Sequence, residues 1–260
     1  MRISFSGSEA EHHRLEAYEG LKSLDGIVRV ATIAAHYAAT NEVRFRAPYS
    51  PMLQVQLSGV KNGSFEFIFD QISKFTDKVL GDASKRRSEA LFSKLVSLGT
   101  GQDDYHVIDV PGTKIPDGDL AAMSEASESA LISAHRWIDD IDKTISIIDG
   151  DDKVEMNSQT KDFVTEEVVG EISNQDVSVA ALNVNNRSGR VYMFDLGRTV
   201  PYAVSRDAES RTVANLSTYL RRYAQGNGDR VNIKYAPIKH NDGRLKKIII
   251  YDCFDVRNAA

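Results

Sequence analysis

The chain has 260 residues, of which 42% are hydrophobic and 27% are charged, as in ordinary globular proteins. This length exceeds the usual size of one domain, so we expect two modest domains with separate cores. No apolar run approaches the ~18 residues of a membrane span, no signal-peptide pattern follows Met1, and the single Cys253 excludes an intramolecular disulfide framework. We therefore expect a cytoplasmic protein without a membrane partner.

Charge is distributed unevenly along the chain. Residues 185–260 contain fourteen Lys or Arg against seven Asp or Glu, whereas the residues before them contain 18 basic and 30 acidic side chains. The basic carboxy-terminal part could bind a polyanion. It could equally face the acidic part of the same chain or of a second copy.

The amino-terminal part is predicted to be an α+β domain. Apolar residues at three- and four-residue steps indicate the first helix, and alternation on both sides of Asn62-Gly63 indicates a hairpin with its phenylalanines facing inward. The expected elements are a strand at 1–7, a helix at 17–40, a hairpin with strands at 53–57 and 65–69, helices at 70–80 and 84–98, and a loop around 110–119.

A longer helix is predicted over 120–148, because apolar residues continue there at steps of three and four. They are Leu131, Ala134, Ile138, Ile141, Ile145 and Ile148. The stripe resembles a coiled-coil seam but lasts only about two and a half heptads. It is either a core stripe within the domain or a self-association surface formed by Leu131, Ile138, Ile141 and Ile145. The acidic turn 149–152 ends it, which gives domains 1–150 and 151–260.

The second domain is predicted to be a small OB-like β-barrel with one inserted helix. The expected elements are strands at 168–174, 177–185, 189–196 and 199–205, a helix at 207–224 with Asp207 as its N-cap, and strands at 230–237 and 244–254. A meander, a helix and a closing hairpin in this order are typical of such barrels. In the strand at 230–237, Val231, Ile233 and Tyr235 alternate with polar residues.

Three segments resemble uncharacterised bacterial and prophage-associated proteins of about this length. They are residues 2–7 (Arg-Ile-Ser-Phe-Ser-Gly), residues 63–66 (Gly-Ser-Phe-Glu) and residues 242–252, which run from Asp-Gly-Arg-Leu-Lys-Lys to Tyr-Asp. The resemblance covers both ends of the chain and carries no activity or catalytic residue. It implies a prokaryotic setting, with phage defence or mobile elements as the context.

Sequence motifs for catalysis are sparse. No phosphate-binding loop, dinucleotide fingerprint or nucleophile elbow occurs, and Cys253 lies in an expected strand. Glu11, His12 and His13 suit a metal by ligand type, with Asp103, Asp104 or His106 as further ligands, but adjacent residues seldom converge on one ion. Asp252 and Asp255 follow an apolar strand, as nuclease acids do, or simply pair with Arg257 or Lys246. His135 is interpreted as a packing or interface histidine. We therefore nominate no catalytic residue, metal or cofactor.

The basic carboxy-terminal surface is the best candidate site. Single-stranded nucleic acids bind where cations line a groove and aromatic rings stack on bases. The nominated residues are Arg190, Arg198, Arg221, Arg222, Lys234, Arg244, Lys246 and Lys247, with Tyr192 and Tyr235 as the rings. Phe194, Tyr223 and Tyr251 lie near them in sequence. Alternation could place some of these rings in the core instead.

These observations favour a non-enzymatic binding or assembly protein. It would self-associate or bind a protein partner, and its basic barrel would bind a partner or nucleic acid. The alternative is a metal-dependent nuclease or hydrolase with a site built from dispersed Asp and His residues.

Overall fold

The structure is a computed structural model that describes residues 1–12, 14–61, 65–73, 78–102, 115–149, 152–226, 230–240 and 243–254. The chain divides into two compact units, Met1–Thr165 and Glu166–Ala260. Both combine helices and strands, so the predicted α+β class is confirmed. The division falls later than the expected boundary at residue 150, so residues 151–165, which were assigned to the second domain, belong to the first unit.

The first unit is built on an antiparallel sheet with strand order β2-β3-β1-β4-β5. The strands are β1 (Arg2–Ser6), β2 (Leu53–Lys61), β3 (Phe65–Ser73), β4 (Thr144–Asp149) and β5 (Asp152–Met156). Strand β1 lies at the centre, where Ile3 stands opposite Phe67 on one side and Ile147 on the other. Because side chains alternate along a strand, Ile3 and Phe5 are fully buried while Ser4 lies on the opposite face.

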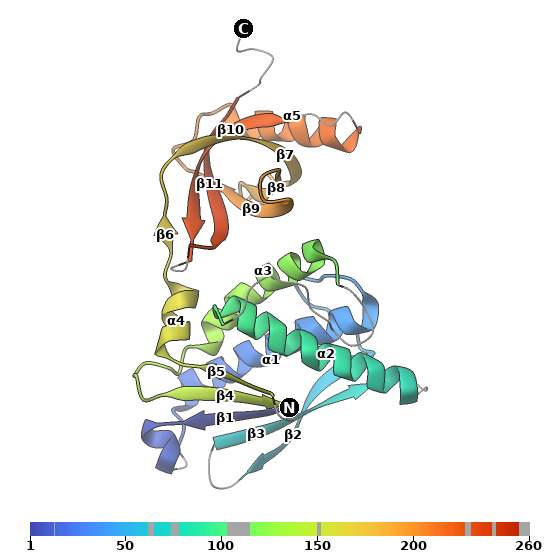
Figure 1. Cartoon of the computed structure of the whole chain (residues 1–260), viewed down its shortest axis with the longest axis vertical. Helices are drawn as coiled ribbons and strands as arrows, with labels where there is room; N and C mark the ends of the chain where they lie inside the picture. Colours follow the sequence, from blue (N-terminus) through green and yellow to red (C-terminus); the bar gives the residue numbers. More distant parts are fainter. Residues whose placement is uncertain are drawn as a thin grey trace. The chain divides into compact units, whose positions relative to one another are not determined.

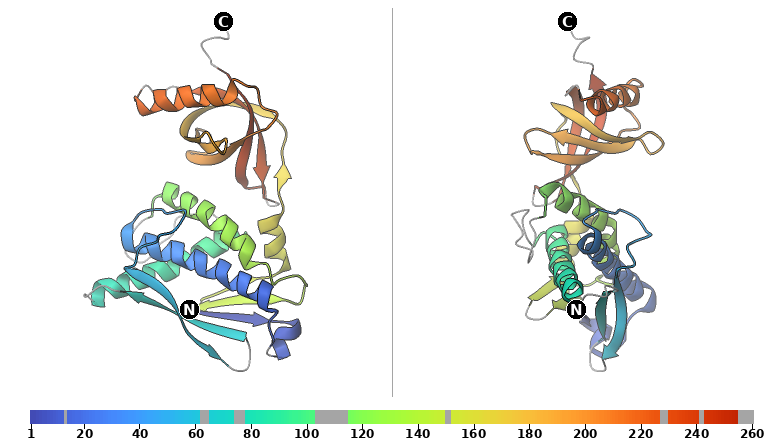
Figure 2. Two further views of the ribbon diagram at one scale, coloured as in Figure 1. Left: turned by 180° about the vertical axis from the view of Figure 1, so that it is seen from behind. Right: turned by 90° about the vertical axis from the view of Figure 1, so that its right-hand side faces the viewer.

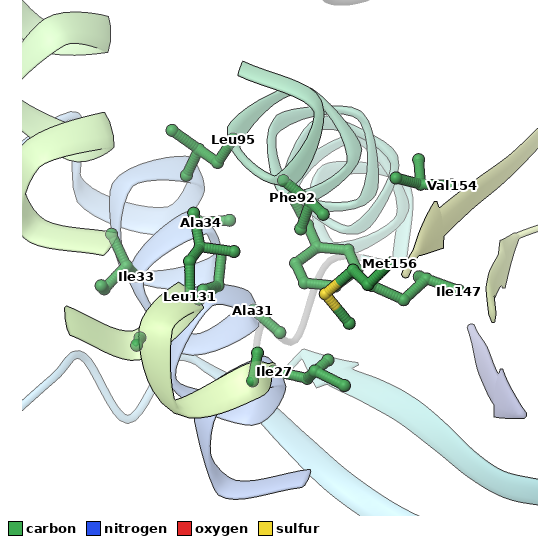
Figure 3. Close-up of a cluster of buried hydrophobic side chains, with 14 of the residues drawn as sticks. Ile27, Ala31, Ile33, Ala34, Phe92, Leu95, Leu131, Ile147, Val154 and Met156 are labelled. Carbon is green, nitrogen blue, oxygen red and sulfur yellow. The ribbon is translucent and has the colours of Figure 1, made fainter. Parts of the chain in front are cut away.

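Helices cover one face of this sheet (Figures 1 and 2). They are α1 (Ala17–Thr40), α2 (Lys78–Gly99) and α3 (Asp117–Ala134); the 3-10 helix η1 (Ser8–His12) and α4 (Ser158–Thr165) complete the unit. The core contains side chains from all three long helices and from the sheet (Figure 3), including Ile27, Phe92, Leu131, Ile147 and Met156. The expected first helix matches α1, and the expected hairpin matches β2 and β3.

The predicted helix over 120–148 is wrong in its second half, because α3 ends at Ala134 and the chain turns before β4. In β4, isoleucine alternates with Ser146, which is the period of a strand. Leu131, Ile138 and Ile145 are buried in the core of this unit, whereas Ile141 is exposed in the turn. The four residues therefore do not form a helical seam.

Other boundaries also differ from the prediction; among them, the expected strands at 168–174 and 177–185 are observed at Val168–Val169 and Ser173–Asn183. Residues 70–73 extend β3, where they pair with β2, and a single helix α2 replaces the two that were expected. In the second unit, the helix begins at Thr212, so Asp207 lies in the preceding turn and is not its N-cap.

The second unit contains a closed five-stranded barrel, as predicted. Its elements are β6 (Val168–Val169), β7 (Ser173–Asn183), β8 (Ser188–Met193), β9 (Arg198–Val204), α5 (Thr212–Ala224), β10 (Val231–Lys239) and β11 (Leu245–Phe254). The strand order is β7-β8-β9-β11-β10, with β9 and β11 parallel, and β10 pairs with β7 to close the ring. The short strand β6 pairs with the end of β10.

The helix α5 lies between the third and fourth barrel strands in the sequence and across one end of the barrel in space (Figures 1 and 2). This order and closure are those of the OB-like barrel that was predicted. Inward residues such as Val179, Val191, Val200 and Ile233 fill the core, and Leu216 of α5 packs onto it. The outward residues of β8 and β9 are therefore held on a rigid surface.

Candidate nucleic-acid interface

The outer surface of β8 and β9 carries polar and aromatic side chains at alternate positions. Val191 of β8 stands opposite Val200 of β9, and both are fully buried. Their neighbours Arg190 and Tyr192 consequently point outward, and Tyr192 stands opposite Thr199.

Two aromatic rings and one guanidinium group form a stack at the end of β8. The rings of Tyr192 and Phe194 meet edge to face, with centroids 5.2 Å apart, and Phe194 is 39% exposed. The guanidinium carbon of Arg230 lies 3.9 Å from the centre of the Phe194 ring. Arg230 directly precedes β10, whose Val231 pairs with Val177 of β7. Closure of the barrel thus brings Arg230 to a ring that is distant in sequence.

Two further arginines lie on the same two strands: Arg190 shares the outward face of Tyr192, whereas Arg198 stands opposite the buried Met193. The Arg190 guanidinium donates to the Thr199 hydroxyl at 3.2 Å, and Arg198 donates to the Leu245 carbonyl at 3.1 Å. Burial, and then the neighbouring charge of Arg198, lower the pKa of Arg190. An arginine still remains charged at neutral pH. We name Arg190, Tyr192, Phe194, Thr199 and Arg230 the outer patch.

The two lysines at the start of β11 contact one carboxylate. The Nζ atoms of Lys246 and Lys247 each lie 3.0 Å from an oxygen of Glu167, which directly precedes β6. Burial opposes ionisation of Glu167, but the hydrogen bonds from the lysines outweigh it, and the pKa of Glu167 is lowered. Glu167 therefore offsets part of the positive charge of this strand.

The other nominated residues do not all lie on the outer patch. Tyr235 is only 8% exposed and donates its hydroxyl to Gln175 at 2.8 Å, so its ring belongs to the barrel core. Lys234 is exposed on β10. Arg221 and Arg222 lie in the last turn of α5, and Arg244 directly precedes β11.

Of the candidate catalytic and metal residues, Asp252 has a structural partner, Glu11 and His12 are exposed in η1, and the others are not described. Asp252 accepts two hydrogen bonds from Arg211, at 2.6 and 3.2 Å, and the hydrogen bond from Arg211 is the main reason that the pKa of Asp252 is lowered. Arg211 was not among the expected partners, and the expected partner Lys246 contacts Glu167 instead. Within the described ranges, no group of three or more His, Cys, Asp or Glu is placed to hold a metal ion. His13, Asp103, Asp104, His106, Asp255 and Arg257 lie outside those ranges.

His135 is a packing residue of the first unit, one of its two predicted roles. Its Nδ1 lies 2.7 Å from the Leu131 carbonyl and its Nε2 lies 3.0 Å from the Thr160 hydroxyl. Because a carbonyl only accepts, the proton sits on Nδ1 and the unprotonated Nε2 faces the Thr160 hydroxyl, which also lies 2.9 Å from the Asn157 carbonyl. Burial lowers the pKa of His135 to about 4, so the ring is neutral at physiological pH.

Comparison with known proteins gives two matches to families of unknown function. Residues 1–101 match a domain of unknown function (DUF7946), and residues 171–254 match a family of unknown function (DUF7947). The predicted resemblance to uncharacterised proteins is confirmed. No curated protein and no solved structure matches the chain. The DUF7947 match contains all five barrel strands and the whole outer patch.

Sequence reasoning found part of the outer patch. The nominated Arg190 and Tyr192 share the outward face of β8, whereas Arg198 stands opposite the buried Met193. Arg230 is not predicted by the sequence, because it joins the patch only through barrel closure. The alternation of Val231, Ile233 and Tyr235 already carried the signal that Tyr235 faces the core. Among the described residues, no helix is long and apolar enough to cross a bilayer.

Proposed function

We propose that the carboxy-terminal barrel binds single-stranded nucleic acid through its outer patch. The observation that carries the proposal is the stack of Arg230 on Phe194 beside Tyr192, with Arg190 on the same face of β8 as Tyr192. The barrel fold alone would not support it, because one fold hosts many functions. The second and third strands of OB-like barrels do, however, form a common oligonucleotide-binding face.

The chemistry of the patch suits a single strand. An exposed aromatic ring offers a surface on which an unpaired base stacks, and alanine substitution of such rings costs about 1–3 kcal/mol per base. Guanidinium groups donate two parallel hydrogen bonds to a phosphate. Unpaired bases can reach both kinds of group at once, whereas the bases of a duplex are stacked on one another. We therefore expect binding with little sequence preference and a strong dependence on salt.

The test is fluorescence anisotropy of a labelled single-stranded oligonucleotide titrated with the full chain, at about 50 and about 200 mM salt. Two variants probe the patch, Phe194→Ala and Arg230→Gln. Their controls are Tyr223→Ala and Lys234→Gln, which remove an exposed ring from α5 and an exposed cation from β10. The patch variants should bind about fivefold or more weakly, while the controls should change binding little.

Equal loss of affinity in patch and control variants would overturn the assignment of the patch. A wild-type chain that binds no oligonucleotide at low salt would overturn the proposed function itself. No observation on the described part of the chain favours a metal-dependent nuclease or hydrolase. Self-association stays a prediction, which light scattering of the purified protein would test.

A further inference from the structure

The loop between α1 and β2, residues 41–52, is held firmly at both ends. At its start, Asn41 adopts a left-handed conformation, and its N–H donates to the Tyr37 carbonyl at 2.8 Å. The Asn41 side chain also accepts a hydrogen bond from Arg87 of α2 at 2.7 Å. Near its end, the Ser50 N–H donates to Nδ1 of the buried His36 at 2.8 Å. These contacts fix where the loop leaves and rejoins the fold.

The tip of this loop presents a ring between two cations. Arg44, Phe45 and Arg46 are all exposed, and 48% of Phe45 is accessible. The Arg44 guanidinium donates to the Pro48 carbonyl across the tip, so the tip has a defined shape. Folding therefore orders an exposed aromatic residue that contributes little to the core, although Tyr49 and Val43 of the same loop pack inward.

Helix α2 adds positive charge close to the base of the loop. Arg87 stacks on Tyr37, with its guanidinium carbon 5.2 Å from the ring centre, while it holds Asn41. Lys85 and the exposed Arg86 immediately precede it, within one helical turn of this contact. The loop itself contains one acid, Glu42. This basic region belongs to a part of the chain whose overall charge is strongly negative.

We infer that the tip residues Arg44, Phe45 and Arg46 form a second nucleic-acid contact, distinct from the outer patch. We name these three residues the loop patch. Two of its members are arginines, whose planar donors match a phosphate, and the third is a ring on which a base stacks. Because the loop is anchored before any ligand arrives, binding orders few groups and loses little entropy.

An anionic membrane is the competing partner for such a surface. A peripheral membrane contact needs a substantial apolar face beside its cations. Here the exposed large apolar side chains of the loop are Phe45 and Met52, with the smaller Ala47, Pro48 and Pro51 also exposed. The loop tip thus combines two exposed guanidinium groups with few large apolar side chains, which favours nucleic acid. Binding to an anionic membrane is one outcome of the experiment.

The test compares variants of the full chain in oligonucleotide binding. The variant Phe45→Ala/Arg46→Gln removes the ring and one cation but keeps Arg44 on the Pro48 carbonyl and all anchoring contacts. Its matched control is Tyr18→Ala/Lys22→Gln, which removes an exposed ring and an exposed cation near the opposite end of α1. The variant Phe194→Ala/Arg230→Gln measures the contribution of the outer patch to oligonucleotide binding in the same assay. Thermal melting checks that each variant folds.

We expect the loop variant to bind at least about fivefold more weakly than its control. Unchanged binding by the loop variant, with a loss in the outer-patch variant, would overturn this inference and leave the proposed barrel function standing. The reverse result would support the loop patch and overturn the barrel proposal. A chain that binds no oligonucleotide but sediments with phosphatidylserine vesicles, through Phe45 and Arg46, would overturn both in favour of a membrane contact.

Discussion

The close approach of α1 and α3 in the first unit makes Gly26 a sensitive position. A Cβ atom at Gly26 would lie 2.4 Å from the Ala130 carbonyl oxygen and 2.4 Å from the Ala134 nitrogen. Both are backbone atoms, so no rotamer change can relieve the contact and the helices must separate. Overpacking of this kind costs about 3 kcal/mol at the upper end of its usual range, and the helix propensity of alanine returns about 1 kcal/mol. Gly26→Ala should therefore lower the stability of this unit by about 2 kcal/mol.

The only tryptophan, Trp137, is buried in the same unit, so its fluorescence reports the unfolding of that unit in urea. Gly118→Ala is the matched control, because Gly118 lies in the first turn of α3 with no atom within 4 Å of an added Cβ. The control should be neutral or gain up to about 1 kcal/mol. If Gly26→Ala were as stable as Gly118→Ala, the two helices would not pack as closely as described.

Two other predictions concern pH and charge. Burial lowers the pKa of His135 from 6.5 to about 4 on folding, so the unfolded chain binds a proton more readily between these values. Stability of the first unit should fall as the pH drops through this window, by on the order of 3 kcal/mol in total. When unfolding is followed by Trp137 fluorescence, His135→Gln should make the free energy of unfolding depend less on pH between 6.5 and 5. An unchanged dependence would contradict the lowered pKa of His135. Glu167→Gln removes the carboxylate beside Lys246 and Lys247. Oligonucleotide binding should then tighten and become steeper in salt, and weaker binding would show that Glu167 supports the site.

The barrel could be predicted because its signals are local. Alternation along β8, β9 and β10 gives the strands, and the glycine-containing turns give their ends. The position of α5 between the third and fourth strands then limits the topology. The first helix and the hairpin of the amino-terminal unit followed for the same reason, since each depends on spacing within a short window.

The prediction of a helix over 120–148 is wrong because a helical spacing and a strand alternation follow each other in one stretch of sequence. Leu131 and Ala134 lie on α3, whereas Ile145 belongs to the period-two pattern of β4. Ile138 lies in the turn between them and happens to fall at a helical step. The buried Lys143 helps to hold this turn, because it contacts Glu9 at 3.1 Å and Asp139 at 2.7 Å. These contacts form only in the folded structure, so the spacing of apolar residues along the sequence does not reveal them.

The candidate site was predictable only within single strands. Arg190 and Tyr192 share one face of β8, as their spacing indicates, but Arg230 reaches Phe194 through pairings of β10 with β7 and of β7 with β8. The loop patch was missed as well, because its definition rests on the anchors that His36 and Arg87 provide. Non-local contacts of this kind decide which charged and aromatic residues converge.

The central claim, that the outer patch contacts a single strand, is tested most directly by photocrosslinking. A single-stranded oligonucleotide carrying a photoreactive base is irradiated with the wild-type chain, and the adducts are located by mass spectrometry. We expect adducts on Tyr192 or Phe194 that are lost at high salt and absent with Phe194→Ala/Arg230→Gln. Adducts confined to other faces of the barrel, or none on the barrel at all, would contradict the claim.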